Sequence, residues 1–147
     1  MSTRMKLAFS LYFLSGLLLA AFGFVYLLRP EFMPYHSVAV GMPWSEVSPN
    51  FKILIIALMR AVGGTVLILA LAFFLILLVP FRQGAKWALW GLPILGLLQS
   101  AGSAYAMSHV ALNTSASPPL WVALAGAILV VVAFALSIPA RNKRAGA

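Results

Sequence analysis

The sequence contains no cysteine, only two acidic residues and little charge of any kind. Lys, Arg, Asp and Glu together make up 8% of its 147 residues. Without cysteine, the chain cannot perform disulfide exchange or thiolate catalysis, and it cannot hold a Cys-ligated metal or an iron–sulfur cluster. So little charge cannot cover the surface of an ordinary soluble domain. The composition therefore predicts a membrane protein.

Both acids, Glu31 and Glu46, lie in one connecting segment and none lies inside an apolar stretch. A proton-coupled exporter normally needs a carboxyl group within the membrane, so this absence weighs against that mechanism. The sequence also lacks a nucleophile-plus-base motif, a phosphate-binding loop and a pair of catalytic carboxylates. It therefore indicates no reaction and no cofactor, and it leaves open whether the protein is an enzyme.

Apolar residues and positive charge are abundant. The hydrophobic content is 63% and the formal net charge is +8. The basic residues form short clusters beside apolar stretches, where membrane orientation explains them, and they lack the interleaved aromatic residues of a nucleic-acid-binding surface. We therefore expect no nucleic-acid partner. The expected partners are membrane lipids and, in addition, another membrane protein or a second copy of the chain.

Four apolar stretches have the length of membrane-spanning helices. They cover residues 7–28, 53–79, 87–107 and 120–138. The predicted fold is therefore all-α, a single membrane domain built as an antiparallel four-transmembrane-helix bundle. Residues 29–52 are expected to form an ordered outer loop, and Pro139 is expected to stop the last helix before a basic tail at 139–147.

The basic residues predict which side of the membrane each end faces. With both termini in the cytoplasm, the outer side holds only Arg29 and Lys52. The inner side then holds seven basic residues, Arg4, Lys6, Arg82, Lys86, Arg141, Lys143 and Arg144. The positive-inside rule favours this N-in/C-in arrangement, which places both acids and both histidines on the outer side.

Arg60 is the one charged residue inside an apolar stretch. An unpaired Arg in hydrocarbon costs at least about 2.5–3.5 kcal/mol, so it needs a partner, water or a route to the interface. Helical rise places Arg60 and Gln99 at similar depths below the outer side, and helical spacing puts Ser103 on the same face as Gln99. We therefore predict a crevice around Arg60 that opens to the outer side.

Three roles are open for Arg60. It can pair with Glu31 or Glu46 and pin the outer loop onto the bundle, with Gln99 satisfying a remaining donor. It can bind an anion or a carbonyl oxygen of a lipid headgroup, a quinone or a small acid, or it can contact another subunit. The leading functional hypothesis is an accessory subunit, or a binder of a lipid-like or quinone-like ligand.

His36, His109, Glu31 and Glu46 form a second candidate set on the outer side. Imidazole and carboxylate groups on one face can hold a divalent ion or relay protons. The spacing is not diagnostic, because two isolated histidines in interfacial loops are usually ordinary polar residues, so no metal site is assigned. This set supports the alternative function, a small membrane oxidoreductase or transferase.

The order of elements resembles the small bacterial DoxX-like four-helix membrane proteins. A first helix ends near a proline, and a loop follows. A second helix then opens with Ala57-Leu58-Met59-Arg60-Ala61-Val62-Gly63-Gly64, and two more helices complete the chain. The resemblance covers most of the chain in architecture, and Arg-Ala-Val-Gly-Gly is its specific piece. It implies the bacterial inner membrane and, for some relatives, quinone- or thiol-linked redox complexes; the lack of cysteine speaks against a thiol role.

Overall fold

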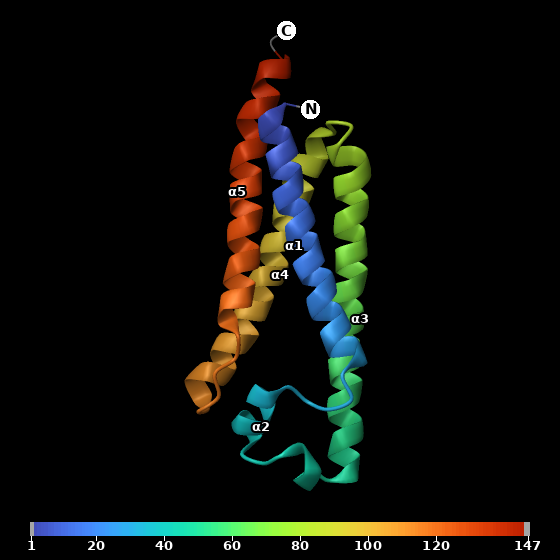
Figure 1. Cartoon of the computed structure of the whole chain (residues 1–147), viewed down its shortest axis with the longest axis vertical. Coiled ribbons are helices and arrows are strands. Elements are labelled where there is room, and N and C mark those ends of the chain that lie inside the picture. The colour runs from blue at the N-terminus through green and yellow to red at the C-terminus, as the bar shows by residue number, and fades with distance from the viewer. Residues whose placement is uncertain (1, 146–147) are drawn as a thin grey trace.

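The computed structural model describes residues 2–145, with side chains as far as Ile138, and this described part contains helices and no strands. The long helices run side by side, with the start of α1 and the end of α5 at one end of the molecule and α2 at the other (Figure 1). The prediction of an all-α fold is confirmed. The elements are α1 (Thr3–Leu28), α2 (Pro34–Val40), η1 (Trp44–Glu46), α3 (Pro49–Ile76), η2 (Leu77–Phe81), α4 (Lys86–Asn113) and α5 (Leu120–Ala145).

Three helices are long and apolar enough to cross a membrane. They are α1, α3 continued by η2 as Pro49–Phe81, and the Leu120–Ile138 part of α5. Within the described residues α4 does not join this group, although it is as long as α3. Gln99, Ser100 and Ser103 interrupt its apolar sequence. The chain is thus a helical membrane protein by the length and composition of three helices.

Pro80 lies inside a continuous helix, where the sequence predicted a helix end. The chain passes Pro80 in the π-helical turn η2, whose shifted hydrogen-bond register accommodates the missing proline N–H. The helix ends at Phe81, and Gly84 in the turn that follows has a φ of 79°. The Ala85 N–H donates to the Pro80 carbonyl at 2.9 Å, and the Gly84 N–H donates to the Phe81 carbonyl at 3.1 Å. This Schellman closure makes the tight turn into α4.

The last helix also continues past the proline that was predicted to stop it. The backbone of α5 is helical to Ala145, so the predicted end at Pro139 is wrong. A proline removes one backbone donor, but its fixed φ is compatible with a helix already formed before it. The side chains of the predicted basic tail lie outside the described residues.

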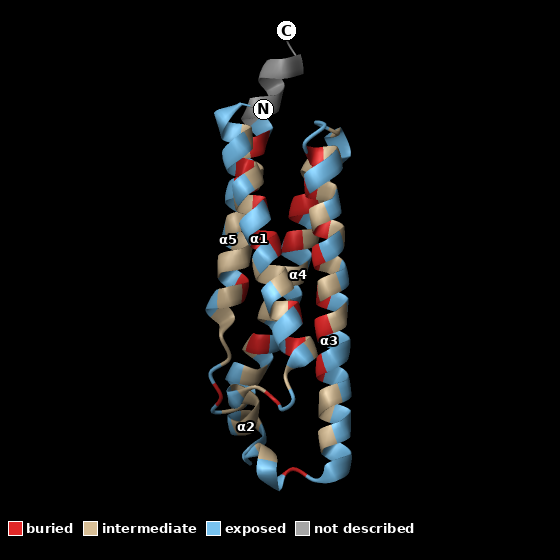
Figure 2. Ribbon diagram, turned by 45° about the vertical axis from the view of Figure 1, so that its right-hand side comes forward, coloured by how far each residue is buried: buried red, intermediate tan, exposed pale blue. Residues whose placement is uncertain are grey.

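Helix α1 is central to the packing, because it contacts both α3 and α5, whereas α3 and α4 contact each other only slightly. Buried positions follow the inward-facing sides of the long helices (Figure 2). The main core lies toward the termini, where the fully buried side chains include Tyr12, Phe73, Leu77, Leu92 and Val130. The helices therefore pack tightly at one end and leave α3 and α4 apart at the other.

Residues 29–52 fold back against the ends of α1 and α3. Phe32 and Val47 are buried together with Tyr26 and Met59. The Trp44 ring meets Phe32 edge-on, with ring centroids 4.9 Å apart. This aromatic and apolar packing orders the segment and brings α2 over the open end between α3 and α4.

Candidate functional site

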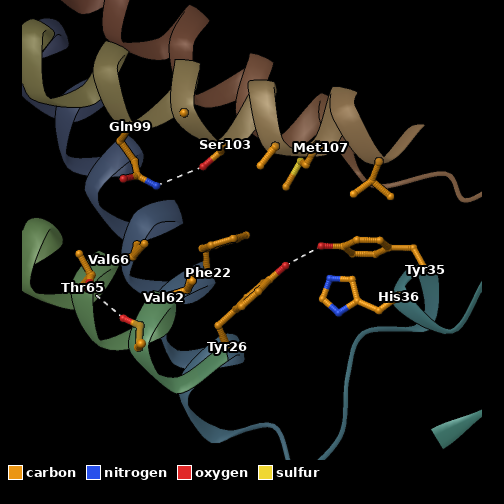
Figure 3. Close-up of a pocket in the computed structure, with 14 residues that line it drawn as sticks. Phe22, Tyr26, Tyr35, His36, Val62, Thr65, Val66, Gln99, Ser103 and Met107 are labelled. Carbon is orange, nitrogen blue, oxygen red and sulfur yellow. Dashed lines mark hydrogen bonds between the residues drawn. The ribbon is translucent and has the colours of Figure 1, made fainter. Parts of the chain in front are cut away.

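A cavity of about 540 Å³ lies between α3 and α4, with α1 along its floor and α2 at the end that is farther from the start of α1 (Figure 1). Figure 3 shows side chains from all four helices converging on it. The cavity exists because α3 and α4 both pack on other neighbours and hardly contact each other. Most of its wall is apolar, including Phe22, Val66 and Met107. Its polar lining residues are Tyr26, Tyr35, His36, Thr65, Gln99 and Ser103.

Small residues line the opening of the cavity where α3 and α4 face each other. Ala61 and Thr65 on α3, and Gly102 and Ala106 on α4, line the cavity and are also exposed on the surface. A Cβ added at Gly102 would meet no atom within 4 Å. If these helices cross a membrane, the cavity therefore opens sideways toward the lipid.

Tyr26, Tyr35 and His36 form the end of the cavity that α2 covers. The two tyrosine hydroxyls are hydrogen-bonded at 2.5 Å, and the His36 ring lies edge-on to Tyr35 with centroids 4.3 Å apart (Figure 3). Burial raises the pKa of Tyr35 and lowers the pKa of His36. Both side chains are therefore uncharged at pH 7, because an ordinary histidine pKa is already about 6.5.

Gln99 and Ser103 form a second polar position on α4. Gln99 Nε2 donates to Ser103 Oγ at 3.1 Å, one helical turn away. Both residues also border a smaller interior cavity of about 40 Å³ between α1, α4 and α5, which the buried Ser15 lines as well. Two of the predicted site residues thus lie side by side on the cavity wall.

Arg60 does not line the cavity, and its side chain is exposed on another side of α3. The Cβ position of Gly63 lies against Tyr26 and Leu27. Arg60 is one turn closer than Gly63 to the start of α3, so it lies near the level at which α1 ends at Leu28. The cavity therefore does not surround Arg60 as predicted, because α3 extends beyond α1 and its first turns lie beside the loop.

The acids do not pair with Arg60. Glu31 forms an ion pair with Arg29, with 3.5 Å between Oε1 and Nη2, and both side chains are partly exposed. Glu46 is exposed, and no ion pair within residues 2–138 joins it to Arg60. An exposed pair contributes about 0–1 kcal/mol, so aromatic packing rather than an Arg60 salt bridge holds the loop in place.

The structure does not bring together the predicted outer set of His36, His109, Glu31 and Glu46. His36 lines the cavity, whereas His109 is exposed on α4 beside Tyr105, with ring centroids 6.4 Å apart. No group of three His, Asp or Glu side chains in the described part of the chain could hold a metal ion. The four side chains therefore do not come together as one metal-binding group.

Tyr26 and Tyr35 are the site residues that sequence reasoning missed. Tyr26 is one of several aromatic residues in an apolar helix, and nothing local distinguishes it. Tyr35 had a local signal in the sequence. Pro34 begins a short helix and Gly41 caps its end, and this helix carries Tyr35 and His36 as neighbours. The contact between Tyr26 and Tyr35 depends on how residues 29–52 fold back. The spacing of residues along the chain does not predict that fold.

Replacing Arg60 by glutamine is expected to change the free energy of unfolding by less than about 0.5 kcal/mol, because the side chain is exposed and lies near the end of α1. Met59, which is 4% exposed, provides the neighbouring control. Met59→Gln should cost about 2 kcal/mol or more, because it buries an amide without a partner. Denaturant titration in detergent, followed by circular dichroism, measures both. A larger loss for Arg60→Gln than for Met59→Gln would show that Arg60 has a structural partner.

Comparisons with protein-family models, with curated proteins and with solved structures gave no match for this chain. The DoxX-like resemblance therefore remains an expectation from the sequence. The functional argument rests on the geometry and chemistry of the cavity.

Proposed function

We propose that the protein binds a lipid-like or quinone-like molecule in the cavity between α3 and α4. The observation that carries the proposal is the composition of the cavity, whose wall is mostly apolar and whose polar groups gather at two positions. Its volume of about 540 Å³ lies within the range of roughly 300–1,000 Å³ that is usual for small-molecule sites. A molecule with an apolar body and a small polar group matches such a cavity.

The membrane arrangement we propose is an antiparallel four-helix bundle with both termini in the cytoplasm. The start of α1 and the turn into α4 lie at the same end of the molecule (Figure 1) and carry Arg4, Lys6, Arg82 and Lys86. Helix α4 serves as the fourth span, because Gln99 and Ser103 face the cavity and not the hydrocarbon. The cavity then lies in the outer half of the membrane. The DoxX-like resemblance favours the bacterial inner membrane.

Within this proposal the protein is an accessory subunit or ligand carrier and not an enzyme. An amphipathic ligand dissolved in the bilayer would enter between the small residues Ala61, Thr65, Gly102 and Ala106 without crossing water. The ligand would then lie against α1, beneath Tyr35 and His36. Such a protein could present a membrane-soluble molecule to a partner protein in the same membrane.

Gly102→Leu is expected to reduce ligand occupancy at least tenfold, because the leucine side chain would fill the opening of the cavity. The backbone has room for it, since a Cβ at Gly102 meets nothing within 4 Å. Native mass spectrometry of protein released from mild detergent would measure the fraction of chains that carry an adduct of lipid or quinone mass.

Gly64→Leu is the matched control for this experiment. Gly64 lies on α3, does not line the cavity and also has open space at its Cβ position. This variant should keep the occupancy of the wild type. Equal occupancy in the Gly102 and Gly64 variants, or no adduct on the wild type, would contradict the proposed function.

A further inference from the structure

His36 presents a hydrogen-bond donor at the outer end of the cavity. Its Nδ1 accepts the backbone N–H of Met33 at 3.3 Å, at the start of α2. A neutral imidazole carries a single hydrogen, so that hydrogen is on Nε2. None of the hydrogen bonds among the described side chains uses Nε2. The Nε2–H group is therefore available to a bound molecule.

The tyrosine pair supplies a second donor beside it. The hydroxyls of Tyr26 and Tyr35 share one hydrogen bond, and either oxygen can be the donor. Whichever accepts keeps its own hydrogen, which no other hydrogen bond of the described residues uses. Because Tyr35 and His36 are neighbours with ring centroids 4.3 Å apart, the two free hydrogens belong to one small region of the cavity wall.

This donor region carries no charge and has no charged neighbour on the cavity wall. The lining residues include no Lys, Arg, Asp or Glu. Arg29 pairs with Glu31, and Arg60 is exposed elsewhere on α3. A charged ligand group would lose its hydration here without gaining a counter-charge, which is costly in an apolar environment. The site therefore favours a polar group that accepts hydrogen bonds and is itself neutral.

We infer that the ligand is an uncharged amphiphile held through a carbonyl-type oxygen, which accepts hydrogen bonds from His36 Nε2–H and from the Tyr26–Tyr35 pair. Its apolar part then lies along Phe22, Val66 and Met107. This inference rests on the proposed ligand-binding function and specifies the polar group that the cavity recognises. It excludes fatty-acid anions and phosphate headgroups as the species bound at this end.

The test compares three probes of equal chain length on the full-length protein in lipid nanodiscs. They are a long-chain methyl ketone, the corresponding carboxylate at a pH at which it is ionised, and the alkane. After correction for partition into lipid, the ketone should bind about tenfold more tightly than the alkane, the gain expected from one or two hydrogen bonds. The carboxylate should bind no more tightly than the alkane.

Variants that remove one donor should weaken this selectivity. Tyr35→Phe and His36→Phe should each reduce the advantage of the ketone over the alkane, while His36→Gln, which keeps an N–H donor, should retain more of that advantage than His36→Phe. Tyr105→Phe and His109→Phe are matched controls outside the cavity and should behave as the wild type does. Isothermal titration of each variant provides the affinities.

The outcomes separate this inference from the function on which it rests. If no probe binds the wild type, the proposed ligand binding itself is wrong. If the three probes bind equally, or the carboxylate binds most tightly, the cavity binds ligands but not through a neutral acceptor. An unchanged ketone preference in Tyr35→Phe, His36→Phe and His36→Gln would also overturn the inference.

Discussion

Replacing Gly63 by valine is expected to lower the free energy of unfolding by about 3 kcal/mol, because it forces α1 and α3 apart. A Cβ at this position would lie 2.5 Å from the Leu27 nitrogen and 2.7 Å from the Gly23 carbonyl oxygen. Both are backbone atoms, which cannot rotate away as a side chain can. Helices in a membrane associate mainly through close packing, so separating them removes the main stabilising contribution.

Gly64→Val is the control for this prediction, since it makes the same substitution one residue later. A Cβ at Gly64 meets nothing within 4 Å, so its valine should change stability by no more than about 0.5 kcal/mol. Thermal unfolding in detergent, followed by circular dichroism, compares the two variants. Equal stability of the Gly63 and Gly64 variants would mean that α1 and α3 do not cross closely at Gly63.

Phe73→Ala is expected to cost about 3 kcal/mol, because it leaves a cavity at the junction of α1, α3 and α4. The Phe73 side chain is 0% exposed. Its ring meets Tyr12 edge-on with centroids 6.0 Å apart, and it borders the Cβ positions of Gly16 and Gly96. The expected value is at the low end for a buried Phe, since lipid is as apolar as the core and only the packing term is lost.

Leu71→Ala distinguishes lost packing from lost hydrophobicity. Leu71 lies on the same helix but is 60% exposed, so lipid or detergent chains can occupy the space that its side chain leaves. Its truncation should cost about 0.5 kcal/mol or less. A chemical unfolding titration measures both changes, and a loss for Leu71→Ala as large as that for Phe73→Ala would contradict the assignment of Phe73 to the tightly packed core.

Gly63 and Phe73 stabilise different parts of the molecule. Phe73 belongs to the core near the termini, whereas Gly63 meets α1 beside Tyr26, which lines the cavity. Loss of the Gly63 contact should therefore also displace the Tyr26 hydroxyl from Tyr35. The close approach of α1 and α3 thus positions one half of the donor region that we assign to ligand binding.

Some site features followed from local sequence alone. The spacing of Gln99 and Ser103 along one helix places them one turn apart, and the structure shows them hydrogen-bonded on the cavity wall. Other features depended on register between distant segments. Arg60 was expected to share a crevice with Gln99, but the fit of Gly63 against Tyr26 and Leu27 places Arg60 near the end of α1 and off the cavity wall.

By itself the sequence determined that this is a helical membrane protein, because length and apolarity of a segment decide whether it can cross a bilayer. Tertiary structure alone decided the partner of Glu31, the exposure of Arg60 and the meeting of Tyr26 with Tyr35. Each depends on how α1 and α3 are aligned and how residues 29–52 fold back over them. The physical reason is that such contacts arise from the packing of segments far apart in the chain, and residue spacing reports only neighbours on the same helix.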